Sequence, residues 1–151
     1  MRPGKPLIRA LGRVHRTVYR ATRGRLLSRV GDARVILITT TGRRSGVPRT
    51  VPLLSIQDGE DWVIVASQAG HDTSPGWYLN LRANPVAAMQ IGRRVIPVRA
   101  IEAGAEEADR LWPRLVAAYP AWEDYRGRTR RRFPVVILRA QSRGNAFTEL
   151  Q

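Results

Sequence analysis

Apolar and β-branched residues gather in six runs between residues 34 and 138, and each run has the length of a strand. Polar residues, glycine and proline separate these runs. Asp58-Gly59 between the second and third runs indicates a tight hairpin turn, and Gly92 separates the fourth and fifth runs in a similar way. The predicted strands are Val35–Thr40, Thr50–Ile56, Trp62–Ala66, Val86–Ile91, Val95–Ile101 and Pro134–Leu138.

Helical patterns occupy the gaps between these strands. Pro75–Asn84 predicts a short helix that ends at the Asn84-Pro85 pair, and Glu106–Ala118 carries apolar residues along one side. Pro120 begins another short helix. Strands in successive hairpins with helices between them favour a small antiparallel barrel of the α+β, mainly β, class. The alternating βαβ units of a Rossmann fold are absent from the pattern.

The first 30 residues predict a basic amphipathic helix. Arginines alternate there with apolar residues at helical spacing, namely Leu7, Leu11, Val14 and Val18. Two interpretations stay open: a helix packed on the domain with a solvated arginine face, or a helix resting on an anionic membrane surface. We divide the chain into this helix (1–30), a barrel domain (31–142) and a C-terminal tail (143–151).

The composition excludes several kinds of chemistry. The chain has no cysteine, which rules out disulfides, thiolate catalysis and zinc–sulfur sites. Two histidines, His15 and His71, are too few to favour a metal cage or a Ser-His-Asp relay. The longest apolar runs, such as Val135–Leu138, are far shorter than a membrane span. We therefore expect a cytoplasmic protein, which the N-terminal helix could bring to the inner face of the membrane.

The charge of the chain predicts an anionic partner. Lysine and arginine number 26 against 12 acidic residues, for a formal net charge of +14. Residues 1–49 hold 13 of the basic residues and a single acid, Asp32. Nearly all the bases are arginine, whose planar guanidinium binds phosphates and carboxylates through paired hydrogen bonds. Nucleic acid is disfavoured, because few aromatic residues interleave with these arginines.

The segment 39–50 is the first that could carry chemistry. Its two glycines allow sharp turns, and it also carries a hydroxyl and three guanidinium groups, from Ser45, Arg43, Arg44 and Arg49. A basic hairpin turn and a phosphate cradle explain this segment equally well. It is neither a Walker loop nor a dinucleotide-binding fingerprint, because the glycine spacing differs from both.

Three later segments each have a functional and a plainer interpretation. The small polar loop 67–77 could line a site or simply connect two elements, with Trp77 in the core and His71 at a solvated tip. Aromatic residues in 119–125 could form a wall or pack on the barrel. The arginine run 126–132 is most simply a solvated face.

Together these segments resemble the deazaflavin (F420)-dependent nitroreductase family of actinobacteria. The resemblance covers residues 30 to 140 and rests on motifs that occur in order: Thr40-Thr-Gly-Arg-Arg-Ser-Gly-Val-Pro-Arg49, Asp58-Gly59, Pro75-Gly-Trp-Tyr-Leu-Asn-Leu-Arg-Ala-Asn-Pro85, Trp112-Pro113, Tyr119-Pro-Ala-Trp-Glu-Asp-Tyr125 and Arg132-Phe-Pro-Val-Val136. It implies a split β-barrel of the FMN-binding type. It also implies coenzyme F420, an 8-hydroxy-5-deazaflavin with a phosphate and a glutamate tail, and the transfer of a hydride to a flat conjugated acceptor such as a quinone or a nitroaromatic compound.

The resemblance also implies roles for particular residues. The cofactor's phosphate and tail would be held by Arg43, Arg44, Ser45, Gly46 and Arg49. The deazaflavin would be lined by Pro52, Leu53, Ser67, Gln68, Ala69 and Trp77. The catalytic residues at the acceptor would be Tyr119, Trp122 and Tyr125, with Ser67. Characterised members carry Ser-Lys-Gly-Gly at Ser67-Gln-Ala-Gly70, and they carry tyrosine at Leu54 and Trp122. At Gln68 and Ala69 a cation near the cofactor is replaced and a Cβ is added where the backbone would approach the ring, while the missing hydroxyl at Leu54 and Trp122 favours quinone-like acceptors over nitroimidazoles.

Two rival functions remain. The same barrel could bind FMN or haem in place of the deazaflavin, and absorbance of the purified protein would distinguish these cofactors. Alternatively, the chain could be a basic binding protein without catalysis, acting at a membrane surface or on nucleic acid.

Overall fold

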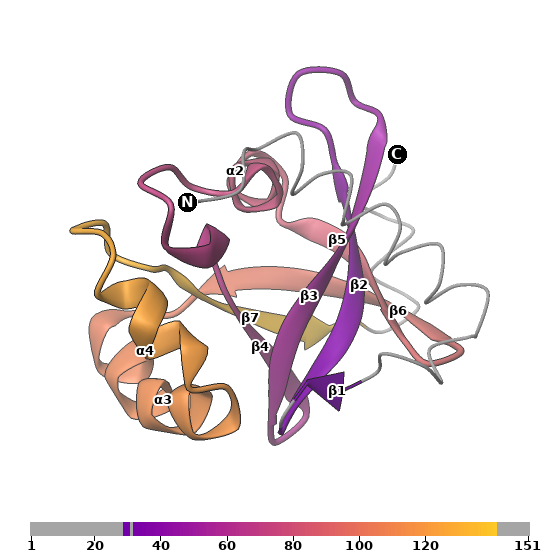
Figure 1. Cartoon of the computed structure of the whole chain (residues 1–151). Coiled ribbons are helices and arrows are strands. Elements are labelled where there is room, and N and C mark those ends of the chain that lie inside the picture. The colour runs from indigo at the N-terminus through magenta and orange to yellow at the C-terminus, as the bar shows by residue number, and fades with distance from the viewer. Residues whose placement is uncertain (1–28, 31, 142–151) are drawn as a thin grey trace.

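A computed structural model describes residues 29–30 and 32–141 of the chain. In this part, seven antiparallel strands form one sheet in the order β1-β2-β3-β4-β7-β6-β5, and an additional pairing of β2 with β5 closes it into a six-stranded barrel (Figure 1). The strands are β1 (Arg29–Val30), β2 (Ala33–Thr41), β3 (Pro48–Asp58), β4 (Asp61–Val65), β5 (Val86–Ile91), β6 (Arg94–Glu102) and β7 (Val135–Ala140). The predicted mainly β split barrel is confirmed.

Three α-helices between the strands match the sequence pattern, and a single helical turn, η1, lies in the segment predicted as a loop. These elements are η1 (Gln68–Gly70), α2 (Gly76–Ala83), α3 (Ala105–Ala118) and α4 (Ala121–Arg126). Figure 1 shows α3 and α4 together on one side of the barrel, while α2 lies near the β2–β3 hairpin. Residues 1–28 of the predicted N-terminal helix and the predicted C-terminal tail lie outside the described residues, while Arg29–Val30, at the end of the range predicted as helix, form strand β1.

Two hydrophobic cores lie on opposite faces of β4 and β7. Ile64 and Leu138 point into the barrel, where they pack with residues of α2. Their strand neighbours Val63 and Ile137 point outward against Leu111 of α3 and the other residues of the second core. Successive side chains of a strand point to opposite faces, so a strand buried on both faces reads as a continuous apolar run. This explains the strand-length apolar runs in the sequence.

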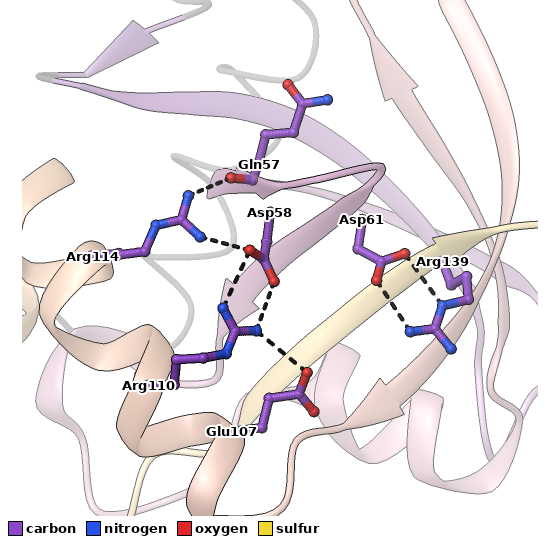
Figure 2. Close-up of polar contacts among 7 residues, drawn as sticks. All are labelled: Gln57, Asp58, Asp61, Glu107, Arg110, Arg114 and Arg139. Carbon is purple, nitrogen blue, oxygen red and sulfur yellow. Dashed lines mark hydrogen bonds and ion pairs between the residues drawn. The ribbon is translucent and has the colours of Figure 1, made fainter.

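The turn between β3 and β4 contains Gly59, which has φ 61°, and Asp58 pairs with Asp61 across it, as the hairpin signal predicted. Asp58 also anchors α3 (Figure 2). Its carboxylate accepts hydrogen bonds from Arg110 Nη2 at 2.9 Å and Arg114 Nη1 at 2.7 Å. These bonds, Arg110 first, lower the pKa of Asp58 below its ordinary value.

Asp61 begins β4, the strand that follows the turn. It accepts a hydrogen bond from Arg139 of β7 at 3.1 Å, which ties β7 to the same hairpin (Figure 2).

None of the described helices is both long and apolar enough to span a membrane. The described residues also contain no group of three His, Cys, Asp or Glu side chains that could hold a metal ion.

Candidate functional site

The arginine-rich segment 39–50 forms the hairpin that joins β2 to β3. Thr41 pairs with Pro48 at the end of the ladder, next to the pair Thr40 and Arg49, and the amide of Gly42 donates to the carbonyl of Val47 at 2.9 Å. Gly46 has φ 70°, a left-handed conformation that suits glycine. Arg44 and Arg49 are exposed and form no ion pair with another described residue. The hairpin therefore presents two guanidinium groups to solvent.

Arg43 has a different position from the other two arginines, because it joins the hairpin to α2. Its backbone amide and its Nη1 both donate to Asn80 Oδ1, at 3.1 Å and 3.0 Å. Asn80 is buried, and its Nδ2 donates to Thr40 Oγ1 at 3.1 Å. Sequence reasoning assigned Asn80 no role, although a polar residue between Leu79 and Leu81 of a short helix is a signal of a buried hydrogen bond.

The loop after β4 contains three successive residues in a left-handed backbone conformation. Gln68 has φ 44°, Ala69 has φ 52° and Gly70 has φ 78°. Left-handed conformations of non-glycine residues are unfavourable and cluster at functional sites. Gly70 also packs closely on α4, where an added Cβ would lie 2.8 Å from the carbonyl oxygen of Tyr125. The small polar loop is therefore a strained segment in contact with the aromatic helix.

Arg131 corrects the interpretation of the run 126–132 as a solvated face. Its guanidinium donates to the backbone carbonyls of His71 at 3.1 Å, Ala66 at 2.9 Å and Ser67 at 2.8 Å. It also lies over the ring of Phe133, 4.9 Å from the centroid. Burial lowers the pKa of Arg131 from its ordinary value. Nothing in the sequence distinguishes this arginine from its neighbours, because its acceptors are about 60 residues away.

The aromatic residues of 119–125 come together, but they face different surroundings. The hydroxyls of Tyr119 and Tyr125 lie 3.3 Å apart, and both side chains are half-buried. Burial, together with the hydrogen bond to Tyr119, raises the pKa of Tyr125 to about 12. Trp122 packs edge-on against Tyr119, but it is only 4% exposed and belongs to the second core.

Other predicted site residues also divide between core and surface. Pro52 and Leu53 are neighbours in β3, so their side chains point to opposite faces, and Leu53 packs against the barrel core. Trp77 is 8% exposed and lies in that core, which agrees with its plainer interpretation. Ser67 is buried, while Gln68 and Ala69 are half-buried at the surface of the loop.

His71 is not the solvated loop tip that we expected. Its side chain is half-buried, and its Nε2 atom is buried without a hydrogen-bond partner among the described residues. Asp72 beside it accepts a hydrogen bond from Thr129 Oγ1 at 2.7 Å. Thr129 and Arg131, which also donates to the His71 carbonyl, thus hold the loop against the segment after α4.

The closed antiparallel barrel, with a basic hairpin and a strained loop, defines a protein of the split-barrel class. A solved structure of a haem-binding protein from Mycobacterium smegmatis has this fold, with a TM-score of 0.57, 18% identity, and coverage of 80% of this chain and 51% of that chain. At this identity the likeness concerns the fold alone.

More similar proteins define the family. The family described as F420H(2)-dependent quinone reductase matches residues 11–140. The F420H(2)-dependent quinone reductase Rv1261c of Mycobacterium tuberculosis is 39% identical over 131 residues, which cover 83% of this chain and 87% of the relative. A solved F420-H2 dependent reductase, FDR-A, has a TM-score of 0.64 and 39% identity, and the match covers 69% of this chain and 92% of that chain.

The chain belongs to the F420H(2)-dependent quinone reductase family, which is a family of oxidoreductases. The resemblance read from the motifs is thereby confirmed, and the cofactor that the family implies is coenzyme F420. The family match begins at residue 11, so the similarity extends further toward the N-terminus than the motifs indicated.

The described residues fit such a cofactor. Arg44 and Arg49 are exposed on the hairpin and could bind a polyanionic tail. In the left-handed run Gln68 and Ala69 are half-buried, and their backbone amides, which donate to no other described residue, could bind a polar edge of a flat ring system. Tyr125 lies on α4, the helix that contacts this run, and the Tyr119 hydroxyl lies 3.3 Å from the Tyr125 hydroxyl.

Proposed function

We propose that this protein binds reduced coenzyme F420 and catalyses the reduction of a quinone. When bound, the deazaflavin supplies a hydride, and with one proton the quinone becomes a hydroquinone. The protein's own contribution is then to hold the two ring systems together and to stabilise charge on the acceptor. This assignment agrees with a composition that offers neither a triad nor a metal site.

The observation that carries the proposal is the arrangement of three features around α2 and η1. The hairpin is joined to α2 through Arg43 and Asn80, and η1 contacts α4 at Gly70 and Tyr125. Direct contacts thus join the arginine hairpin to α2 and the loop at η1 to the helix that carries Tyr125, and the segment 71–75 connects η1 to α2 along the chain. A cofactor with an anionic tail and a flat ring needs this combination.

We assign the residues as follows. The tail and phosphate are held by Arg43, Arg44, Ser45, Gly46 and Arg49. The deazaflavin is lined by Pro52, Leu53, Ser67, Gln68, Ala69 and Trp77. Arg49 and Arg44 act directly through charge, whereas Arg43 acts also by fixing the hairpin to Asn80. Pro52 and Leu53 contribute different faces of β3, so only one of these side chains can contact the ring directly.

The acceptor is positioned by Tyr119 and Tyr125, with Trp122 supporting Tyr119 from the core. A pKa of about 12 keeps the Tyr125 hydroxyl protonated at physiological pH. It can then donate a hydrogen bond to a carbonyl oxygen of the quinone as negative charge develops there. Because Leu54 and Trp122 offer no hydroxyl, we expect apolar quinones to be better acceptors than nitroimidazoles.

The experiment that tests the proposal is titration of the purified protein with F420, followed by fluorescence. We expect saturable binding at micromolar concentration or below. Arg49→Ala should weaken binding by about 1–3 kcal/mol, the scale of a hydrogen bond to a charged group. FMN binding more tightly than F420, or a haem absorbance band in the purified protein, would replace this proposal with one of its rivals.

We also propose that the protein is cytoplasmic and contacts the inner membrane surface through its basic N-terminal segment. The support is the sequence, in which residues 1–24 alternate arginines with apolar residues. The full chain should sediment with anionic liposomes, and a chain lacking residues 1–24 should remain in the supernatant. Equal sedimentation of both forms would contradict this role.

A further inference from the structure

The three hydrogen bonds of the Arg131 guanidinium all go to the backbone of the loop between β4 and α2. Its Nη1 and Nη2 donate to Ala66 and Ser67, which precede the left-handed run, and its Nε donates to His71, which follows it. The planar fork of arginine can reach both sides of the run at once, whereas a lysine ammonium cannot. The guanidinium therefore holds the two ends of η1 at a set separation.

The loop needs such a support because its own hydrogen bonds are few. Within it, the amides of Gly70 and His71 donate to the carbonyls of Ser67 and Gln68, at 3.0 Å and 3.1 Å. Gln68 and Ala69 both have positive φ, which is unfavourable for residues that carry a Cβ. Strain of this kind persists only where surrounding contacts offset it. The hydrogen bonds of Arg131 provide such contacts, because they are made to residues just before and just after the strained Gln68 and Ala69.

The resulting conformation orients a set of backbone donors. Ser67 is right-handed, with φ −86° and ψ −31°, and Gln68 after it is left-handed. This order of conformations turns successive amide N–H groups toward a common concavity, which binds anions and electron-rich oxygens. The amides of Ser67, Gln68 and Ala69 donate no hydrogen bond to another of the described residues.

We propose that Arg131 is a positioning residue for the cofactor, which acts by holding Ser67–Gly70 in the shape that presents these amides. The inference rests on the proposed function, because it takes the loop as part of the F420 site. Arg131 itself need not touch the cofactor, since its Nε, Nη1 and Nη2 atoms each already donate to one of the three carbonyls. Its neighbour Arg130 is exposed and serves as a matched control.

The test compares Arg131→Met with Arg130→Met in the full-length protein. F420 dissociation constants are measured by fluorescence well below the Tm of each variant. We expect Arg131→Met to bind F420 at least about tenfold more weakly, the consequence of losing charge-assisted hydrogen bonds. Arg130→Met should stay close to the wild type. A merely structural role for Arg131 would lower the Tm and leave the dissociation constant unchanged.

A double variant, Ala69→Gly with Arg131→Met, tests whether Arg131 affects F420 binding by holding the strained loop. Ala69→Gly relieves the strain at φ 52° without adding any donor. If Arg131 acts through the strained loop, Ala69→Gly should improve F420 affinity more in the Arg131→Met background than in the wild type. Two outcomes would overturn the inference about Arg131 and leave the proposed function standing. One is an equal effect of Ala69→Gly on F420 affinity in the wild type and in Arg131→Met, and the other is unchanged F420 binding by Arg131→Met. Failure of the wild type to bind F420 would overturn the proposed function itself.

Discussion

The hydroxyl of Tyr125 lies 3.3 Å from that of Tyr119, in a half-buried position where the ionised phenolate is disfavoured. Burial and this hydrogen bond together raise the pKa of Tyr125 to about 12. At the residue scale, the chemistry of the site therefore depends on groups that stay in one protonation state. Arginine remains charged and Tyr125 remains neutral, so in the proposed site both would act by binding and orientation.

Tyr125→Phe should lower quinone reduction by about tenfold to a thousandfold, the usual cost of losing one hydrogen bond in the transition state. Cofactor affinity should change little, because the proposed F420 contacts lie on the hairpin and on η1. Stopped-flow oxidation of reduced F420 by menadione measures the rate, and fluorescence titration measures the affinity. An unchanged rate would mean that Tyr125 only packs against its neighbours.

The same residue predicts a pH dependence of stability. The ordinary pKa of tyrosine is 10.0 and that of folded Tyr125 is about 12, so the neutral form is favoured by folding. This contribution is complete below about pH 10 and is lost as the pH rises through about 12. Tyr125→Phe should therefore lose less stability than the wild type over that window. Urea unfolding at pH 8 and pH 11 would measure the difference, and parallel losses would contradict it.

At the scale of elements, the protein links its parts through close backbone contacts and polar anchors. The ion pairs of Asp58 with Arg110 and Arg114 fix α3 to the β3–β4 turn. Asn80 fixes the arginine hairpin to α2, and the close approach of Gly70 to Tyr125 fixes η1 to α4. Each anchor joins segments that are distant in sequence. The site therefore depends on the relative placement of elements and not on any one motif.

Two glycine substitutions test the contact between η1 and α4. Gly70→Ala places a side chain on a residue with φ 78°, which strains the backbone. The new Cβ would also lie only 2.8 Å from the Tyr125 carbonyl oxygen, which is a steric clash. Gly46→Ala has φ 70° and no atom within 4 Å of the added Cβ, so strain alone remains. We expect Gly46→Ala to reduce the free energy of unfolding by about 1 kcal/mol and Gly70→Ala to reduce it further.

Thermal and urea unfolding of both proteins would check this order. A Gly70→Ala protein as stable as Gly46→Ala would show that η1 and α4 move apart without cost. The affinity for F420 provides a second readout, because displacement of η1 should weaken binding even when the barrel remains folded.

At the scale of the whole molecule, the net charge of +14 governs encounter with an anionic cofactor. We expect the F420 dissociation constant to rise as sodium chloride increases from 50 mM to 500 mM, because salt screens exposed charges over about 10 Å at 0.1 M. Arg49→Ala should show a weaker salt dependence than the wild type. Salt-independent binding would mean that the tail does not lie against the arginine hairpin.

Local patterns in the sequence determined the elements of this protein. Strand-length apolar runs, the Asp58-Gly59 turn and the Asn84-Pro85 helix end all act over a few residues, so β2 to β7 and α2 to α4 could be predicted within a few positions. The motifs from Thr40 to Val136 also indicated the family, which the comparisons confirm. Hydrophobic periodicity and turn-forming residues act over short stretches of chain, so the amino-acid sequence is sufficient to identify them.

Only the tertiary structure decided which polar residues support the site. Arg131 looks like its neighbours in the sequence, yet its hydrogen bonds to Ala66, Ser67 and His71 span 60 to 65 residues. The left-handed run at Gln68 and Ala69 has no propensity signal, because surrounding contacts impose it against local preference. Closure of the barrel brings together segments that are distant in the sequence. These long-range contacts decide which side chains meet and which strained backbone conformations are tolerated, and no local sequence pattern reports them.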